Sequence, residues 1–231
     1  GDVFRAFVKA GIDKVWNNQG IEHVCFAQVD NPLADPVNLD LLGYHKEHKC
    51  DVAIQAVKRE SIEEQVGLVV KEGEKTVIIE YLDATPELSS LAMLANIIFF
   101  CFSLSFIQKI GNLMLPIHKV LKAIGSGKKT KAWKYEHFVF DALSYAKSVG
   151  IMLFPRSDVF APLKEASGLA GPDAVKQALI NKDQKIMSKI LNKDFLSSSF
   201  ELSPEFHYPT EKLLSSLDSD LSLEGYISLK K

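Results

Sequence analysis

The stretch CFAQVDNPL, residues 25–33, places an acidic residue where an apolar run ends. Residues 21–29 predict a strand, and Asp30, Asn31 and Pro32 follow it directly. In open α/β sheets, ligands bind beyond the carboxyl ends of the strands, so an aspartate at such an end can contact a ligand. Asp-Asn-Pro is also typical of a plain turn. From this stretch alone, Asp30 is either a turn residue or a ligand-binding group.

Strand and helix patterns alternate around this stretch. We predict helices over residues 3–16, 36–44, 116–124, 135–148 and 173–191. We predict strands over residues 21–29, 51–57, 67–71, 76–82 and 149–154, with a hairpin turn between the third and the fourth. Alternation with an interrupting hairpin indicates an α/β fold with a mixed sheet.

The length allows one large domain with a small appendage, since the chain has 231 residues. The residue composition changes near a serine run at residues 197–199, after which apolar residues alternate with polar ones. We therefore expect one domain over residues 1–195 and a small strand-bearing piece over residues 196–231.

Several classes of partner and location are disfavoured by composition. The net charge of −2 supplies no basic field for nucleic acid or for an anionic membrane. Residues 91–107 carry no charge, but a membrane-spanning helix needs about 20 residues, so we expect a buried core segment. Cys25, Cys50 and Cys101 form no CxxC pair, which favours reduced thiols in a cytoplasmic protein. The first residues contain no initiator Met and no signal peptide, as though cut from a longer chain.

Two motif-like stretches fail on spacing. GSGKKT, residues 125–130, lacks the P-loop pattern, because Lys122 and Lys129 stand where Gly and Ser or Thr are required, so we expect a solvated basic turn. HKEHKC, residues 45–50, offers three possible zinc ligands without a fourth at usable spacing, so we expect an exposed helix end.

Eight further stretches occur in the order of a known family's motifs. Among them are VDNPLADP (29–36), EEQVGLVV (63–70), VIIEYLD (77–83), LANIIFF (94–100), EHFVFD (136–141) and FAPLKEA (160–166). Together they resemble the eukaryotic-type UDP-N-acetylglucosamine pyrophosphorylases. The resemblance implies a mixed, mainly parallel sheet of the nucleotide-sugar transferase type, Rossmann-like and GT-A-like, here incomplete. It also implies a uridylyltransferase that joins UTP to a sugar 1-phosphate and releases pyrophosphate, with Mg²⁺ at the phosphates.

The resemblance assigns roles to individual residues. It puts Asp30 beside the phosphates and the metal, and Lys164 on a phosphate. It puts six residues at the sugar: Gly67, Glu80, Tyr81, Asn96, Phe138 and Phe140. Other interpretations remain open for most of these residues: strand-end geometry for Gly67, a salt bridge for Glu80, a satisfied core amide for Asn96, plain core packing for the two phenylalanines and a solvated charge for Lys164. A glutamate inside an apolar strand, as expected for Glu80, is costly to bury without a partner.

The chain also departs from the family pattern. Ala95 and Glu165 replace a family glycine and asparagine, and the family's Gly-rich nucleotide loop would lie upstream of the first residue. We therefore expect this chain to supply the sugar- and phosphate-binding half of the site and to be inactive alone. UDP-N-acetylglucosamine is the favoured product. The alternatives are UDP-glucose, or a truncated non-catalytic protein that binds sugar nucleotides or another protein.

Overall fold

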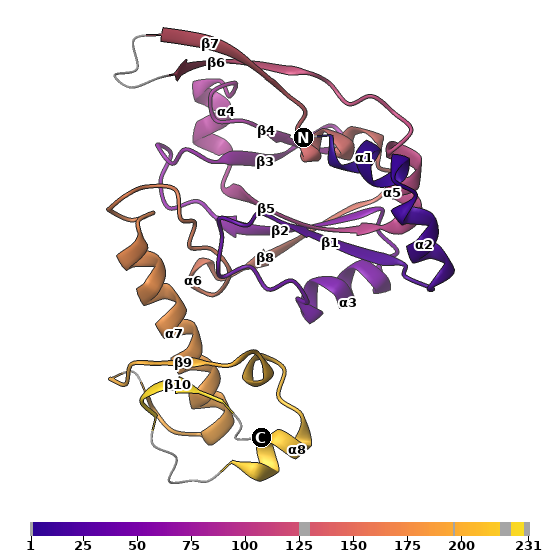
Figure 1. Cartoon of the computed structure of the whole chain (residues 1–231). Helices are drawn as coiled ribbons and strands as arrows, with labels where there is room; N and C mark the ends of the chain where they lie inside the picture. Colours follow the sequence, from indigo (N-terminus) through magenta and orange to yellow (C-terminus); the bar gives the residue numbers. More distant parts are fainter. Residues whose placement is uncertain (1, 125–129, 196, 218–222, 229–231) are drawn as a thin grey trace. The chain divides into compact units, whose positions relative to one another are not determined.

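The chain divides into two compact units in the computed structural model, each described here by itself (Figure 1). The structure describes residues 2–124, 130–195, 197–217 and 223–228, so most of the basic turn at 125–130 lies outside it. The first unit comprises residues 1–28 and 35–154, and the second comprises residues 29–34 and 155–231. The expected domain boundary between residues 195 and 196 falls within the second unit and stays a prediction.

A six-stranded sheet forms the centre of the first unit, in the order β4-β3-β5-β2-β8 with β1 also paired to β5 (Figure 1). Its strands are β1 (His23–Ala27), β2 (Val52–Lys58), β3 (Gly67–Glu72), β4 (Lys75–Ile79), β5 (Leu94–Ser103) and β8 (Val149–Phe154). β2 follows one edge of β5. The other edge of β5 is shared, because β3 pairs with its beginning and β1 with its end.

The direction of β5 corrects one expectation about the sheet. β1, β2 and β3 are each antiparallel to β5, and β8 is parallel to β2, so these four strands run the same way. β5 runs against them from the centre of the sheet, and β4 does so at one edge. The α/β class and the mixed sheet are confirmed. The expected mainly parallel pairing is wrong, because the reversed central strand leaves β2 and β8 as the one parallel pair among the described strands of this sheet.

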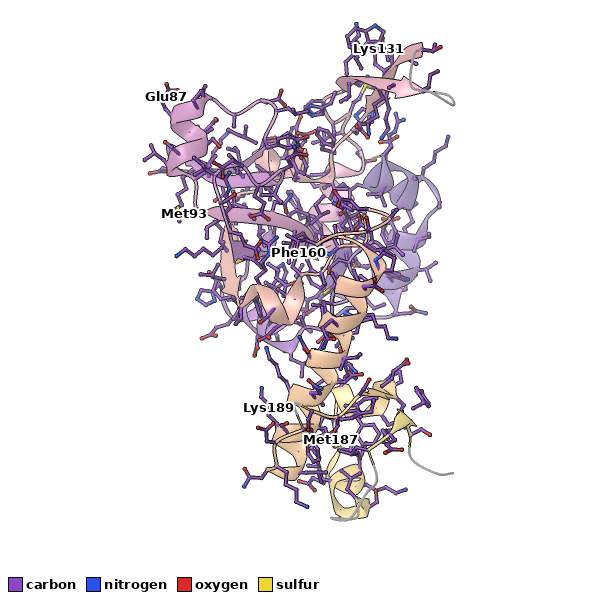
Figure 2. All side chains as sticks on the ribbon, turned by 90° about the vertical axis from the view of Figure 1, so that its left-hand side faces the viewer. Glu87, Met93, Lys131, Phe160, Met187 and Lys189 are labelled. Atoms are coloured by element: carbon purple, nitrogen blue, oxygen red, sulfur yellow. The ribbon has the colours of Figure 1, made fainter. Side chains whose placement is uncertain are left out.

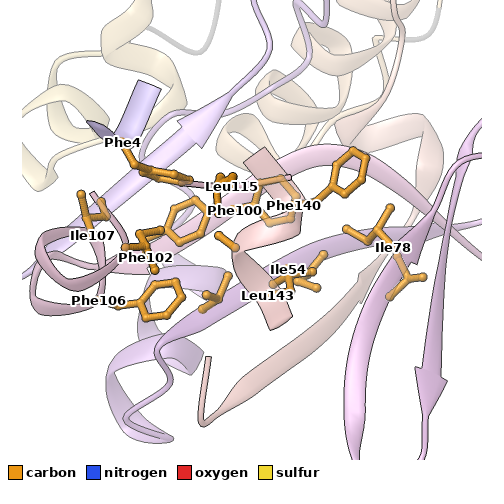
Figure 3. Packing of buried hydrophobic residues seen from close by; sticks show 14 residues of the cluster. Phe4, Ile54, Ile78, Phe100, Phe102, Phe106, Ile107, Leu115, Phe140 and Leu143 are labelled. Atoms are coloured by element: carbon orange, nitrogen blue, oxygen red, sulfur yellow. The ribbon is translucent and has the colours of Figure 1, made fainter. Parts of the chain in front are cut away.

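Helices cover both faces of this sheet. The helices of the first unit are α1 (Val3–Lys9), α2 (Ile12–Asn18), α3 (Leu39–Glu47), α4 (Pro86–Leu91) and α5 (Leu104–Ile110), with the 3₁₀ helix η1 (Val139–Tyr145). α1 and α5 contribute to one apolar cluster, in which Phe4 meets Phe102 edge to face at 5.1 Å between ring centroids (Figure 3). α3 packs on β2 and β5 from the other face. The helix expected over residues 3–16 is two helices, because Gly11 takes a left-handed backbone with φ of 73°.

The uncharged run at residues 91–107 is a core segment, as expected. Most of it forms β5, in which Phe99, Phe100 and Phe102 are almost fully buried. Among the described residues, no helix combines the length and the apolar character that crossing a membrane requires.

Two expected helices are wrong. Residues 118–124 form strand β6 (His118–Ile124), which pairs antiparallel with β7 (Thr130–Glu136) in a separate ribbon. Cross-strand pairs such as Leu121 with Trp133, and the ammonium of Lys119 4.0 Å from the Trp133 ring centroid, stabilise this ribbon. The second expected helix, 135–148, instead contains the end of β7 and then η1.

The second unit has its own apolar core. It contains α6 (Arg156–Val159), α7 (Pro172–Leu191), β9 (Phe200–Leu202), η2 (Pro204–His207), α8 (Glu211–Ser216) and β10 (Gly225–Ile227). α7 confirms the helix expected over residues 173–191. It buries Met187 completely in a cluster with Phe200, Phe206 and Ile227, whereas Lys189, two residues along the helix, is exposed (Figure 2). β9 and β10 pair in parallel, so the C-terminal part contains strands, as expected.

Candidate functional site

Three of the residues assigned to the sugar meet at the beginning of β3. Gly67 is the first residue of β3 and pairs with Asn96 of β5. A Cβ atom on Gly67 would lie 3.5 Å from both the Asn96 Cβ and the Glu80 Oε1. Glu80 is half-buried and directly follows β4, which ends at Ile79 rather than at residue 82 as expected. A glycine, an amide and a carboxylate therefore share one end of the β3–β4 hairpin.

Asn96 also supports a distortion of β5. Its Oδ1 accepts a hydrogen bond of 2.9 Å from the backbone N–H of Ile98. Ile98 has φ of 53°, which is costly for a β-branched residue, and the pairing of β2 with β5 skips from Phe99 to Asn96 at this point. Asn96 is buried, with 5% of its surface exposed. The structure thus gives the Oδ1 of Asn96 a structural role in β5.

A hollow of about 580 Å³ lies beside Glu80. It is lined by the turn at residues 80–83, by β6 residues 118–122, and by Glu136 and Phe138. Tyr81 and Phe138 therefore reach the same space as Glu80. Phe140 stacks on Phe138 with ring centroids 4.8 Å apart, but it belongs to the buried core and does not line the hollow. Of the two phenylalanines, Phe138 is the one placed to touch a ligand.

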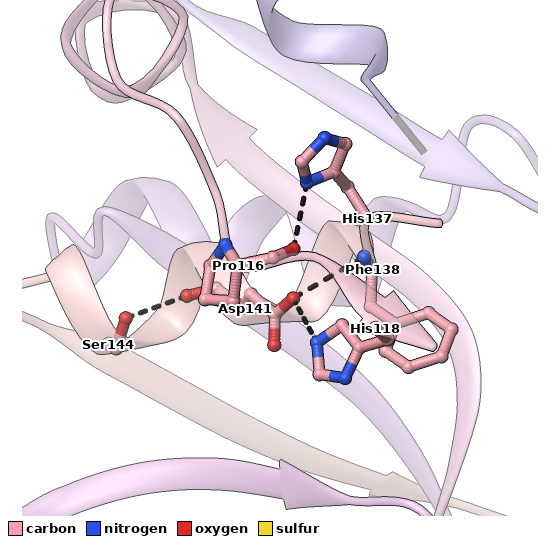
Figure 4. A network of polar contacts seen from close by, with 6 residues as sticks. All are labelled: Pro116, His118, His137, Phe138, Asp141 and Ser144. Atoms are coloured by element: carbon pink, nitrogen blue, oxygen red, sulfur yellow. Dashed lines mark hydrogen bonds and ion pairs between the residues drawn. The ribbon is translucent and has the colours of Figure 1, made fainter. Parts of the chain in front are cut away.

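A polar network next to Phe138 was not anticipated from the sequence (Figure 4). His118 donates from Nε2 to the carboxylate of Asp141 over 2.8 Å, and its ring lies 4.2 Å from that of Phe138. His137 donates from Nδ1 to the carbonyl oxygen of Pro116 over 2.8 Å. The sequence predicted a helix for the segment that contains His118, so its position beside this hollow was not expected.

The other two predicted residues form an ion pair in the second unit. Lys164 Nζ lies 3.5 Å from Asp30 Oδ2, and both side chains are partly exposed. The backbone repeats the pairing, because Leu163 N–H donates to the Asp30 carbonyl over 2.7 Å. Asp30 therefore follows the strand end as expected and meets the lysine assigned to phosphate.

Asn31 holds this pair in place, and sequence reasoning treated it only as a turn residue. It is buried and donates to the Val159 carbonyl over 2.8 Å, while its Oδ1 accepts from Ala161 N–H over 3.0 Å. Lys182 adds a bond of 3.1 Å to the Leu33 carbonyl. These contacts fix residues 29–34 against residues 159–163. The one sequence signal was the asparagine of the VDN triplet.

The second carboxylate oxygen of Asp30 has an unfilled position. Oδ1 is shielded from solvent and makes no hydrogen bond within the described part of the chain. A buried carboxylate oxygen without a donor is unfavourable, and a cation is one partner that satisfies it. Mg²⁺ in phosphate-handling sites is held by one or two carboxylates together with substrate phosphates. The environment of Asp30 fits such an ion.

Comparison with known proteins identifies the family of this chain and agrees with its fold. Residues 1–207 match the family model described as UTP–glucose-1-phosphate uridylyltransferase. The match covers most of the chain, so the chain belongs to this family of nucleotidyltransferases.

The relatives carry mainly N-acetylglucosamine names. A probable UDP-N-acetylglucosamine pyrophosphorylase of Encephalitozoon cuniculi is 32% identical over 71% of this chain and 48% of its own length. The UDP-N-acetylglucosamine pyrophosphorylase of Saccharomyces cerevisiae is 28% identical over 73% of this chain and 40% of its own length. The chain thus spans about half or less of the length of these relatives.

Solved structures share the fold. A putative UDP-N-acetylglucosamine pyrophosphorylase from Entamoeba histolytica matches with a TM-score of 0.72 at 27% identity, over 81% of this chain and 52% of the other. A UDP-glucose pyrophosphorylase from Leishmania major matches with a TM-score of 0.60 at 19% identity, over 73% and 40%, which is a likeness of fold alone.

Proposed function

We propose that this chain supplies the sugar- and phosphate-binding half of a UDP-sugar pyrophosphorylase that makes UDP-N-acetylglucosamine and pyrophosphate from UTP and N-acetylglucosamine 1-phosphate. The observation that carries the proposal is the meeting of Gly67, Glu80 and Asn96 at the end of the β3–β4 hairpin, where Glu80 also lines the hollow with Tyr81 and Phe138. Membership of the uridylyltransferase family supports the same reaction class.

In the proposed reaction, a phosphate oxygen of the sugar 1-phosphate attacks the α-phosphorus of UTP. The new P–O bond forms as the bond between the α-phosphorus and its bridging oxygen breaks, and pyrophosphate leaves with the electron pair. Such transfers need little covalent help from a protein, because positioning and charge neutralisation lower most of the barrier.

The chain's own groups divide these tasks. Glu80 accepts hydrogen bonds from sugar hydroxyls, and the Tyr81 hydroxyl and Asn96 amide add polar contacts. The missing side chain of Gly67 lets the sugar approach the backbone, and Phe138 packs against the N-acetyl methyl group. Lys164 exchanges its contact with Asp30 for a substrate phosphate, which leaves the Asp30 carboxylate as a ligand for Mg²⁺. The bound Mg²⁺ would neutralise phosphate charge.

UDP-glucose is the competing product, because the family model carries the name of the glucose enzyme. An N-acetyl group needs an apolar wall, which Phe138 offers. The location that fits best is the cytoplasm, which the three free cysteines support.

The test is direct binding, which does not depend on turnover. We expect isothermal titration to give at least tenfold tighter binding of UDP-N-acetylglucosamine than of UDP-glucose, a difference of about 1.4 kcal/mol. Tyr81→Phe and Glu80→Gln should each weaken that binding, and Lys9→Gln, an exposed change on α1, should not. Equal affinity for the two sugar nucleotides would remove the proposed preference for N-acetylglucosamine, and tighter binding of UDP-glucose would favour the glucose enzyme. Failure of the full protein to bind either sugar nucleotide would overturn the proposal.

A further inference from the structure

Three potential metal ligands meet within the first unit. None of them is among the residues assigned above to the sugar or to the phosphates. The ligand atoms of His23 on β1, His45 on α3 and Cys101 on β5 all lie within 4.8 Å of one another. The two Nδ1 atoms of the histidines are 3.0 Å apart. From the sequence, His45 was considered only within the run at residues 45–50, where an exposed helix end and no zinc site was expected.

The sheet register explains how residues so distant in sequence converge. Cys101 lies opposite Cys25 in the pairing of β5 with β1, and His23 is two residues before Cys25. Alternate residues of a strand share a face, so His23 and Cys101 project from the same side of the sheet. α3 packs on β2 and β5 and carries His45 to these two residues. On its other side Cys101 is paired with Ala53, whose small side chain takes little room.

The histidines are short of hydrogen bonds. The Nε2 atoms of His23 and His45 are both shielded from solvent and make no hydrogen bond to the described residues, although Glu22 lies 3.9 Å from the Nε2 of His23. Only 1% of His45 is exposed, so water does not substitute for the missing partners. Because one Nδ1 donates to the other, one ring keeps a lone pair on Nε2, and the second ring offers one to a metal ion when its proton moves from Nε2 to Nδ1.

We propose that His23, His45 and Cys101 form a zinc-binding site. One ring nitrogen from each histidine and the Cys101 sulfur supply three ligands, and the fourth position is open to water. A hollow of about 560 Å³, lined in part by His23, His45 and Ser103, leads to the cluster. Imidazole and thiolate are the ligands that zinc prefers, and three protein ligands with an open fourth position are a common arrangement.

The distances need only small adjustment. Zinc bonds of about 2.0 to 2.3 Å put tetrahedral ligand atoms about 3.3 to 3.8 Å apart. The two Nδ1 atoms, hydrogen-bonded to each other at 3.0 Å, are slightly closer than that, and the ligand atoms of the cluster are no more than 4.8 Å apart. Side-chain rotations of His23, the least buried of the three, close this gap. Binding releases the Cys101 thiol proton to solvent, and the Cys101 sulfur then bonds the metal as a thiolate.

The test uses the chain stripped of metal with a chelator and titrated with Co²⁺ as a spectroscopic probe. We expect one equivalent to produce a thiolate-to-cobalt charge-transfer band, and Zn²⁺ to displace it. Cys101→Ala should abolish the band, and His45→Gln should weaken Zn²⁺ binding at least 100-fold. Two matched controls should keep the charge-transfer band and the Zn²⁺ affinity. Cys50→Ala changes a second buried thiol, and His48→Gln changes an exposed histidine just after α3.

Thermal unfolding gives an independent measurement. Zn²⁺ should raise the Tm of the wild type and of the controls, and not that of the ligand variants. Should Cys101→Ala fail to fold, His23→Gln removes a ligand whose side chain is 24% exposed and therefore costs less. The absence of a band in the wild type, or a band that persists in the Cys101 and His23 variants, would overturn the site. Both outcomes are independent of sugar-nucleotide binding, because none of the three metal ligands is among the residues proposed to contact the sugar or the phosphates.

Discussion

Asp30 combines an ion pair through one carboxylate oxygen with an unfilled position at the other. Asp30→Asn keeps the size of the side chain and removes its charge, so the fold should persist while Mg²⁺ and phosphate binding suffer. We expect turnover in the full protein to fall about 10²- to 10³-fold, the usual cost of losing one electrostatic contact in a reaction of this kind. Pyrophosphate release measures it, with circular dichroism to check folding.

The matched control for this change is Asp158→Asn. Asp158 is a more exposed carboxylate of the same unit, paired with Lys185. Turnover should stay within twofold of the wild type. Near-normal turnover in Asp30→Asn would remove Asp30 from the reaction and leave it as a turn residue, the interpretation that its sequence context always allowed.

Asn31 is expected to matter for stability through the two hydrogen bonds that tie it to Val159 and Ala161. Asn31→Ala leaves a buried carbonyl and a buried N–H without partners, which should lower the free energy of unfolding by about 1 to 3 kcal/mol. Urea unfolding measures the loss. Asn112→Ala, which removes an exposed asparagine bonded only within its own turn, should change it by less than about 0.5 kcal/mol. An equal effect of both changes would contradict the role given to Asn31.

Residue-level prediction from the sequence succeeded where a local pattern carried the signal. Asp30 follows an apolar strand and is read directly from the chain. Asn31 and His118 were missed because their roles depend on partners 128 and 23 residues away. His45 was judged part of an exposed helix end, yet it is buried, because its partners His23 and Cys101 come from two strands that no spacing rule connects.

At the scale of elements, the two glycines Gly67 and Gly43 predict opposite outcomes for the same substitution. A Cβ on Gly67 would sit 3.1 Å from the Ile78 Cγ2, so Gly67→Ala displaces the buried Ile78 side chain by a few tenths of an ångström and should cost about 1 kcal/mol of unfolding free energy. Gly43 lies exposed inside α3 with nothing within 4 Å of such an atom. Gly43→Ala should therefore raise that free energy by about 0.5 to 1 kcal/mol.

The same pair separates packing from ligand contact. Gly67→Ala should also weaken UDP-N-acetylglucosamine binding, because the new methyl group lies within 3.5 Å of Glu80 Oε1. Gly43→Ala should leave that binding unchanged. Undiminished sugar binding by Gly67→Ala would show that the end of the β3–β4 hairpin does not face the sugar.

Elements with strong periodicity or length were predictable, and paired surface strands were not. α7 buries one face and β5 is buried along most of its length. Burial selects apolar residues at these positions, so both elements can be recognised from the local sequence. β6 exposes most of its residues, so it has little apolar alternation, and its strand form depends on pairing with β7. The direction of β5 is set by the topology of the sheet, and the sequence of β5 itself does not indicate it.

For the whole molecule, the two units carry different parts of the proposed chemistry. Gly67, Glu80, Asn96 and Phe138 belong to the first unit, and Asp30 and Lys164 belong to the second. Segment 29–34 joins the second unit although the chain on both sides of it belongs to the first, so the peptide that bears Asp30 is fixed by residues more than 120 positions later. A single substitution should therefore weaken the binding of one part of the substrate, the sugar or the phosphate, more than the binding of the other.

The cross-comparison of two variants tests this division. Glu80→Gln should weaken N-acetylglucosamine 1-phosphate binding about tenfold, because one charge-assisted acceptor of sugar hydroxyls is lost, and should leave pyrophosphate binding within twofold. Lys164→Met should weaken pyrophosphate binding more than it weakens N-acetylglucosamine 1-phosphate binding, since it removes a positive charge at the phosphate position and no sugar contact. Calorimetric titration of each variant with each ligand gives the four dissociation constants. Because the binding of each ligand is measured separately, the result does not require turnover. If each variant weakened both ligands equally, the assignment of sugar to the first unit and phosphate to the second would be wrong.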